Sequence, residues 1–279
     1  MTPGRRPARR AANRAALGTP VAVIPPALIG VLFLLVPTVA LVWRTPWHSI
    51  GRIYRENQIW AALRVSVETS LLALAASLVI GVPLAWVLAR VRLPGMGLLR
   101  AIVIIPLVLP PVISGVGLFD AFGRFGLLGD EVQSVFGAPL PFTVPAIVVA
   151  QTFVAMPFLV ITVEGAFRVV DVGVEEAAAT LGASRGRIFT HVTLPVVAPA
   201  IVLGAVLCWA RALGEFGATL LFAGNLSGPR QTLPSAVLYV FDNDPSQAPA
   251  LALPLMLVAV VVLGVMRDRW LRPTFGTAS

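Results

Sequence analysis

Residues 175–195, with the sequence EEAAATLGASRGRIFTHVTLP, place charged and small side chains between two apolar runs. These residue types suit contact with another protein rather than covalent chemistry. Residues 174–181 are compatible with a helix, and Glu175 and Glu176 fall in its first turn, where carboxylates suit the positive end of the helix dipole. Gly182 can end that helix, and Ser184 can cap a second one. The pattern predicts two short helices joined at a glycine, lying along the membrane with an alanine-rich surface open to solvent.

Physical arguments leave two interpretations of this segment. An alanine-rich helix carries little bulk and can fit into a groove of a partner protein. An amphipathic loop would instead rest on lipid headgroups, but such loops usually carry bulky apolar anchors and abundant positive charge. The first predicted helix is acidic and its apolar residues are small, which favours a docking element.

Arg211 and Glu215 form a second charged set, inside an apolar run. Their spacing of four places them on one face of a helix, where they can pair. Charges within a membrane span normally face the bundle interior or a water-filled path. The pair can therefore fix the orientation of the helix or form part of a translocation gate, and the spacing alone does not separate these roles.

The apolar stretch AIVIIPLVLPPVISGVGLF, residues 101–119, contains Pro106, Pro110 and Pro111. Proline removes backbone hydrogen bonds, so this span cannot be a plain helix, and its freed groups need neighbours or a water-lined path. A kinked helix and a path-lining segment both satisfy this requirement. The candidate residues for a path or gate are Arg211, Glu215, Pro110, Pro111 and Ser114.

The composition is that of an all-α integral membrane protein, because 57% of the 279 residues are hydrophobic and only 12% are charged. All 21 basic residues are arginine. A phosphate-binding P-loop needs lysine, so any ATP hydrolysis must occur in another subunit. The net charge of +8 fits arginines at the ends of spans rather than nucleic-acid binding. A single cysteine and two unpartnered histidines predict no disulfide and no metal site.

Six apolar segments have about the length that a bilayer requires. They are residues 21–43, 62–89, 101–119, 143–166, 196–222 and 248–266. A basic arm at residues 1–20, expected to be disordered, precedes them, residues 167–195 form a loop, and residues 267–279 form a tail. The basic start also suits a signal peptide, but the first segment is longer than an ordinary signal and lacks a convincing cleavage site, which favours a retained helix.

The arginines are distributed unevenly between the two sides of this topology. With the N-terminus inside, fourteen arginines fall on the cytoplasmic side and six on the opposite side, and Arg211 lies within a span. This excess places both termini and the loop 167–195 in the cytoplasm. The fourteen are Arg5, Arg6, Arg9, Arg10, Arg14, Arg90, Arg92, Arg100, Arg168, Arg185, Arg187, Arg267, Arg269 and Arg272.

The loop resembles the cytoplasmic EAA loop of ABC-importer permeases. Its pattern is Glu-Ala-Ala at 176–178, Gly182, then Val192 where the family has isoleucine, and Leu-Pro at 194–195. The resemblance implies a type I importer fold with a coupling helix that sits in a cleft of a separate ATPase. The residues expected to carry the coupling are Glu175, Glu176, Ala177, Ala178, Leu181, Gly182, Ala183, Arg187 and Phe189.

The stretch RALGEFGATLLFAGN, followed by QTLP, resembles permease subunits of molybdate importers and, less closely, those of sulfate and thiosulfate importers. The similarity covers most of the chain after about residue 60. It implies a homodimer in the plasma membrane of a prokaryote, with each chain crossing the bilayer several times. Two copies of an ATPase carry ATP and magnesium, and this chain needs no cofactor. An external binding protein delivers molybdate or tungstate.

Three alternatives differ from a molybdate importer. The same machine can carry sulfate or thiosulfate. A stand-alone secondary transporter would need coupling-ion carboxylates near the membrane midplane, whereas Glu68 and Glu164 fall toward opposite span ends. A membrane anchor or sensor would not need six spans interrupted by proline.

Overall fold

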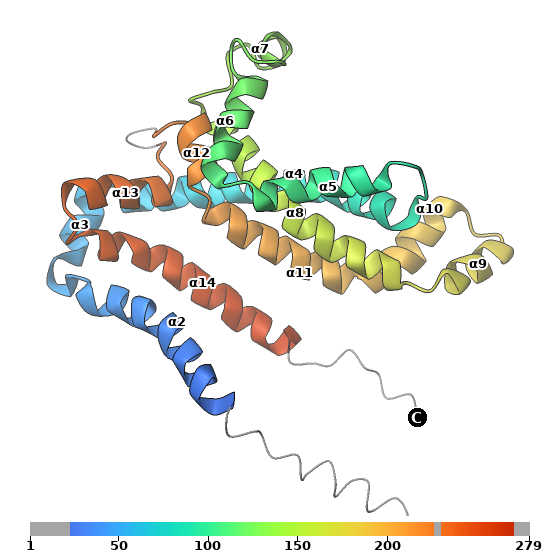
Figure 1. Ribbon diagram of the computed structural model, residues 1–279, viewed down its shortest axis with the longest axis horizontal. Helices are drawn as coiled ribbons and strands as arrows, with labels where there is room; N and C mark the ends of the chain where they lie inside the picture. The colour runs from blue at the N-terminus through green and yellow to red at the C-terminus, as the bar shows by residue number, and fades with distance from the viewer. Residues whose placement is uncertain (1–22, 226–229, 271–279) are drawn as a thin grey trace, which may run out of the picture.

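The computed structural model describes residues 23–225 and 230–270, and these residues form helices and connecting turns without a β-strand (Figure 1). The predicted N-terminal arm 1–20 and most of the predicted tail, residues 271–279, lie outside the described residues. The helices are α2 (Ile24–Arg44), α3 (Ile50–Glu56), α4 (Ile59–Arg90), α5 (Met96–Val108), α6 (Pro111–Phe122), α7 (Gly129–Phe136), α8 (Val144–Val169), α9 (Val172–Thr180), α10 (Arg185–Ile188), α11 (Leu194–Leu213), α12 (Gly217–Phe222), α13 (Leu233–Asn243) and α14 (Ala248–Trp270). A short 3₁₀ turn, η2 (Trp47–Ser49), precedes α3, and a π-helical turn, η3 (Phe189–Thr193), joins α10 to α11.

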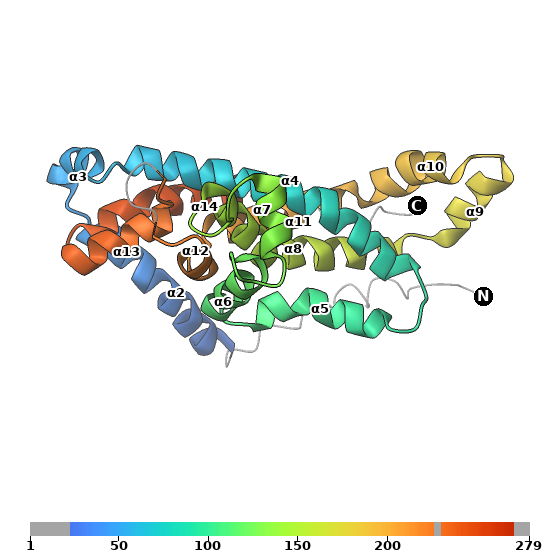
Figure 2. The same ribbon diagram turned by 90° about the horizontal axis from the view of Figure 1, so that it is seen from above.

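The centre of the molecule consists of α4, α8 and α11, which lie side by side (Figures 1 and 2). Their contact faces are rich in small residues, so the backbones approach closely. At Gly204 of α11, an added Cβ would lie 3.1 Å from a methyl group of Leu159 on α8. At Gly81 of α4, it would lie 3.2 Å from Val160. Small residues therefore let the three helices approach closely, and larger side chains such as Leu159 and Phe167 fill the rest of the core.

Four helical stretches are long and apolar enough to cross a membrane: α2, α4, α8 and the continuous stretch Arg185–Leu213. The pair α5 and α6 can form a fifth span, although it is bent by 118°. The apolar part of α14, Ala248–Val262, matches the sixth predicted segment but is shorter. The chain thus spans the bilayer several times, and the count of six stays a prediction.

Two predicted spans contain breaks. In the third, Leu109 and Pro110 are extended between α5 and α6, because a residue before proline avoids the helical region. This confirms that the segment is not a plain helix. The fifth predicted span, 196–222, is not one helix either, because α11 ends at Leu213 and α12 starts at Gly217. Gly214 is a poor helix former, and the Glu215 carboxylate accepts a hydrogen bond from the backbone N–H of Ala218 at 2.8 Å, which starts the new helix.

The two ends of the bundle differ in their side chains. Near the end where α9 and α10 project (Figure 1), α4 ends at Arg90 and α8 carries Arg168 in its last turn. At the opposite end, Trp43, Trp47 and Trp60 are exposed, as expected for aromatic side chains at a membrane interface. Arginines also lie near the opposite end, at Arg44, Arg52 and Arg55, so the predicted arginine asymmetry and the assignment of either end to the cytoplasm stay predictions.

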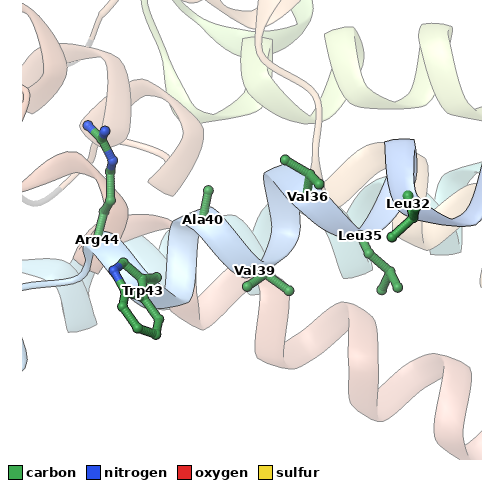
Figure 3. A pocket seen from close by; sticks show the side chains of 7 residues that line it. All are labelled: Leu32, Leu35, Val36, Val39, Ala40, Trp43 and Arg44. Atoms are coloured by element: carbon green, nitrogen blue, oxygen red, sulfur yellow. The ribbon is translucent and has the colours of Figure 1, made fainter. Parts of the chain in front are cut away.

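Helix α2 is peripheral. None of its residues is buried, and it packs against α14 (Figure 1). A shallow depression along it is lined by apolar side chains, from Leu32 to Trp43, with Arg44 at its end (Figure 3). Such a surface suits lipid or another membrane helix rather than a polar ligand.

Candidate functional site: a projecting loop and two broken helices

The loop between α8 and α11 forms the two short helices that the sequence predicted. The side chain of Asp171 accepts the N–H of Gly173 at 2.9 Å and caps α9, which begins at Val172, two residues earlier than expected. Glu175 is therefore in the first turn, and Glu176 lies just beyond it.

The turn between α9 and α10 depends on Gly182. Its φ of 84° lies in the left-handed region that favours glycine. Gly182 donates its N–H to Ala179 and Ala183 donates to Ala178, which is the Schellman arrangement at a helix C-terminus. Ser184 then caps α10 by accepting the N–H of Arg187. Local rules thus produce the helix–glycine–helix shape.

The nine candidate coupling residues lie on one projection at the end of the bundle, but they do not all face outward (Figure 1). The exposed members are Glu176, Ala177, Leu181, Gly182 and Arg187, whereas Glu175, Ala178, Ala183 and Phe189 are half-buried. Leu181 is 88% exposed at the tip, an unusual place for a leucine. Small residues around one exposed leucine are a surface that a complementary groove can cover.

Phe189 joins the loop to the membrane bundle. Its ring lies 6.4 Å from the ring of Phe167 on α8 and 6.3 Å from that of Trp86 on α4. Phe167 itself is fully buried. Phe189 therefore anchors the base of the loop. Its predicted part in coupling would come from contact with the membrane helices rather than with a partner protein.

Two residues that were not predicted from the sequence hold the loop against the membrane helices. Arg90, at the end of α4, makes a salt bridge to Glu175 with an N–O distance of 3.0 Å. Thr193, in η3, donates its hydroxyl to the same carboxylate oxygen at 2.7 Å. Arg90 lies 85 positions from Glu175, and no spacing rule relates residues so far apart.

The candidate path residues also come together, from α6 and from the break after α11. An added Cβ at Gly217 would lie 2.9 Å from the Cβ of Pro111, and one at Gly115 would lie 2.9 Å from the carbonyl oxygen of Ala218. Ser114 is buried beside Gly115, and its hydroxyl has no hydrogen-bond partner among the described residues. The broken third span and the broken fifth span are thus packed against each other at glycines.

Arg211 and Glu215 pair as predicted, but across the end of a helix rather than along it. Their closest N–O distance is 2.6 Å, with Glu215 1% exposed and Arg211 28% exposed. The guanidinium N–H does not point along this contact, so charge rather than an aligned hydrogen bond holds the pair. The other oxygen of Glu215 accepts the N–H of Ala218. One buried carboxylate therefore joins the end of α11 to the start of α12.

Comparison with known proteins identifies the family of this chain. Residues 77–275 match the family of binding-protein-dependent transport system inner membrane components. The chain belongs to this family. The matched region includes the projecting loop and both broken helices.

Members of the family with similar sequences include molybdenum transport permeases. The chain is 44% identical over 241 residues to the molybdenum transport system permease protein ModB of Mycobacterium tuberculosis, covering 86% of this chain and 91% of that protein. It is 38% identical over 212 residues to ModB of Escherichia coli, covering 76% and 93%. The sulfate transport system permease protein CysT of Escherichia coli is 33% identical over 248 residues, covering 88% and 89%.

Solved structures share the fold. A chain of a bacterial alginate ABC transporter, in complex with an alginate pentasaccharide-bound periplasmic protein, superposes with a TM-score of 0.72 at 18% identity, covering 89% of this chain and 93% of that chain. A chain of the inward-facing MetNI methionine ABC transporter superposes with a TM-score of 0.52 at 20% identity, covering 75% and 91%. These likenesses support the type I permease fold that the loop motif implied.

Proposed function

We propose that this chain is the membrane permease subunit of an ATP-driven importer for molybdate. The observation that carries the proposal is the 44% identity to a molybdenum transport permease over nearly the whole of both proteins. A permease subunit moves its solute by changing conformation and performs no covalent chemistry on it, so its work is a coupling between two distant sites.

The choice of molybdate over sulfate follows from the order of similarity. Identity is 44% and 38% to the two molybdenum transport permeases but 33% to the sulfate permease. The two oxyanions have the same tetrahedral shape and charge, so a hydrated path alone separates them poorly. Sulfate or thiosulfate is therefore the second candidate, and tungstate is expected to accompany molybdate.

The projecting loop is the proposed contact with the ATPase. It extends beyond the membrane helices at one end (Figure 2) and offers Leu181 among small exposed residues. Two copies of this chain would present two such loops to two ATPase subunits. A binding protein loaded with the oxyanion would dock at the opposite end, near α3 and α13.

The packed breaks at α6 and α12 are the proposed position of the gate. A helix break inside a membrane is tolerated where neighbouring segments or water satisfy the backbone. Here the broken segments meet at Gly115 and Gly217, where the nearest atoms include those of Pro111, Ala218 and Leu221. In this proposal, a small shift of one segment changes the space beside the Arg211–Glu215 pair.

A stand-alone secondary transporter is the rival from another class. Glu68 is exposed and pairs with Arg64 near the start of α4, while Glu164 pairs with Arg100 and Arg168 near the end of α8. These carboxylates lie toward opposite span ends and are already neutralised by arginine. Neither is placed to bind a coupling ion at the midplane.

The deciding experiment reconstitutes the chain with its ATPase subunit in liposomes and adds the external binding protein. Molybdate-loaded binding protein should raise ATP hydrolysis several-fold and drive molybdate into the vesicles, whereas the unloaded protein should not. An ATPase variant without hydrolysis is the matched control for uptake. Stimulation by sulfate-loaded protein alone would move the assignment to sulfate, and uptake without any ATPase would overturn the importer class.

A further inference from the structure

One oxygen of Glu175 connects three separate parts of the chain. Its Oε1 accepts a hydrogen bond from Arg90 at the end of α4 and another from Thr193 at the entrance to α11. Arg90 also contacts the carbonyl of Val170, where α8 ends. The ends of three core helices therefore meet at one side chain of the loop.

Helix α9 has little else to hold it in place. It has no buried residue. Among the described residues, its other side-chain hydrogen bonds, from Thr180 to Ala177 and from the N–H of Gly173 to Asp171, are local to the loop. The side chains of Arg90 and Glu175 are only 16% and 22% exposed, so their ion pair is sheltered from water and salt. Among the ion pairs and side-chain hydrogen bonds of the described residues, those of Glu175 join α9 to the membrane helices.

The π-helical turn η3 brings Thr193 into this contact. The N–H of Leu194 bonds to the carbonyl of Phe189, five residues back, so the turn is wider than an α-helical one. Thr193 is buried at the base of the loop. Such insertions in helices commonly mark functional positions. Here the wide turn places a hydroxyl donor opposite Glu175 without interrupting the stretch Arg185–Leu213.

The neighbouring carboxylates have different surroundings. Glu176 is exposed and forms no ion pair or side-chain hydrogen bond within the described part of the chain, so its charge is free for a partner. Glu175 is half-buried, and its Oε1 accepts hydrogen bonds from Arg90 and Thr193. Two adjacent glutamates thus face the two sides of the loop.

We infer that Glu175 is the positioning residue that carries the movement of α9 to α4 and α11, with Arg90 and Thr193 as its receivers. The inference rests on the proposed function, in which an ATPase moves α9. A push on the loop reaches α11 along the chain through α10 and η3. It reaches α4 through the Arg90–Glu175 ion pair and through Phe189, whose ring lies 6.3 Å from that of Trp86 on α4. Of these two links, the ion pair is the one that starts on α9.

The test measures molybdate imported per ATP hydrolysed in liposomes that contain the permease, its ATPase and the loaded binding protein. Glu175→Gln and Arg90→Gln should each lower this ratio at least tenfold. Arg90→Lys should retain most of it, because one terminal nitrogen makes the contact and an ammonium can replace it. Thr193→Val should lower the ratio about threefold, and Thr193→Ser should leave it near wild type.

The control is Glu68→Gln, which removes an exposed ion pair within α4, near its other end, and should not change the ratio. Exchanging the charges in Arg90→Glu/Glu175→Arg should recover more transport per ATP than either single change. Wild-type ratios in Glu175→Gln and Arg90→Gln would overturn the inference. If the wild-type complex itself shows no ATP-dependent uptake, the proposed function fails instead. If Glu175→Gln fails to assemble, the comparison of transport per ATP between Thr193→Val and Thr193→Ser tests the inference instead.

Discussion

Glu215 is almost completely buried, and its only cationic partner among the described residues is Arg211, four positions earlier and 2.6 Å away. The arginine is partly exposed and the carboxylate is not. Removing one residue of the pair therefore has a different consequence for the residue that remains. Arg211 can hydrate when it loses Glu215, whereas Glu215 cannot hydrate when it loses Arg211.

We therefore expect Arg211→Gln to be more harmful than Glu215→Gln. The first leaves an uncompensated buried charge, with a cost of about 3 kcal/mol. The second keeps an oxygen that can still accept the N–H of Ala218. Thermal unfolding of the purified protein in detergent measures both. The double variant should be more stable than Arg211→Gln alone, and additive losses would show that the two residues act separately.

Gly115→Ala should disturb the packing of α6 on α12. The new Cβ would lie 2.7 Å from the Cβ of Leu221, and such overpacking typically costs about 1–3 kcal/mol. Gly117→Ala is the control. It lies on the same helix, and no neighbouring atom lies within 4 Å of a Cβ added there. We expect reduced uptake and a lower unfolding temperature for the first variant only. Equal behaviour would show that the α6–α12 contact does not matter.

Gly182→Val should uncouple transport while leaving membrane insertion intact. No atom lies within 4 Å of an added Cβ, so the harm comes from the positive φ, which costs a branched residue about 1–2 kcal/mol. Asparagine tolerates this conformation, so Gly182→Asn should retain most of the uptake. Comparison of the two uptake rates, at equal amounts of protein in the membrane, separates backbone strain from bulk. A functional valine variant would contradict the role of this turn.

Leu181→Ser should weaken the association with the ATPase. The leucine is 88% exposed, so its loss should leave the stability of this chain within about 0.5 kcal/mol of wild type. Leu93→Ser provides a comparison, since that leucine is 62% exposed in the turn between α4 and α5. Co-purification in mild detergent should lose the ATPase for Leu181→Ser and keep it for Leu93→Ser.

Features governed by local rules could be predicted from the sequence. The helix–glycine–helix loop follows from Gly182 and Ser184, and the broken third span follows from Pro110 and Pro111, because each acts on its own backbone. The end of α11 at Leu213 was missed, although Gly214 and Gly217 on either side of Glu215 were a signal for it. The apolar composition of residues 196–222 instead favoured one continuous span.

Relationships between distant segments could not be predicted. Nothing in the sequence indicates that Gly217 faces Pro111, or that Arg90 and Thr193 meet at Glu175. These contacts depend on how α4, α8 and α11 pack together. The inward position of Phe189 has the same origin, because its partners Trp86 and Phe167 come from two other helices.

The unbroken stretch Arg185–Leu213 has a mechanical consequence. At 1.5 Å per residue it is a rod about 44 Å long, with the docking loop at one end and Arg211 at the other. The close approach of Gly204 to Leu159 divides it into arms of about 29 and 14 Å. A tilt about this fulcrum moves the two ends in opposite directions, and the end near Arg211 moves about half as far. A large displacement of the loop end then becomes a smaller, opposite displacement at the end near Arg211.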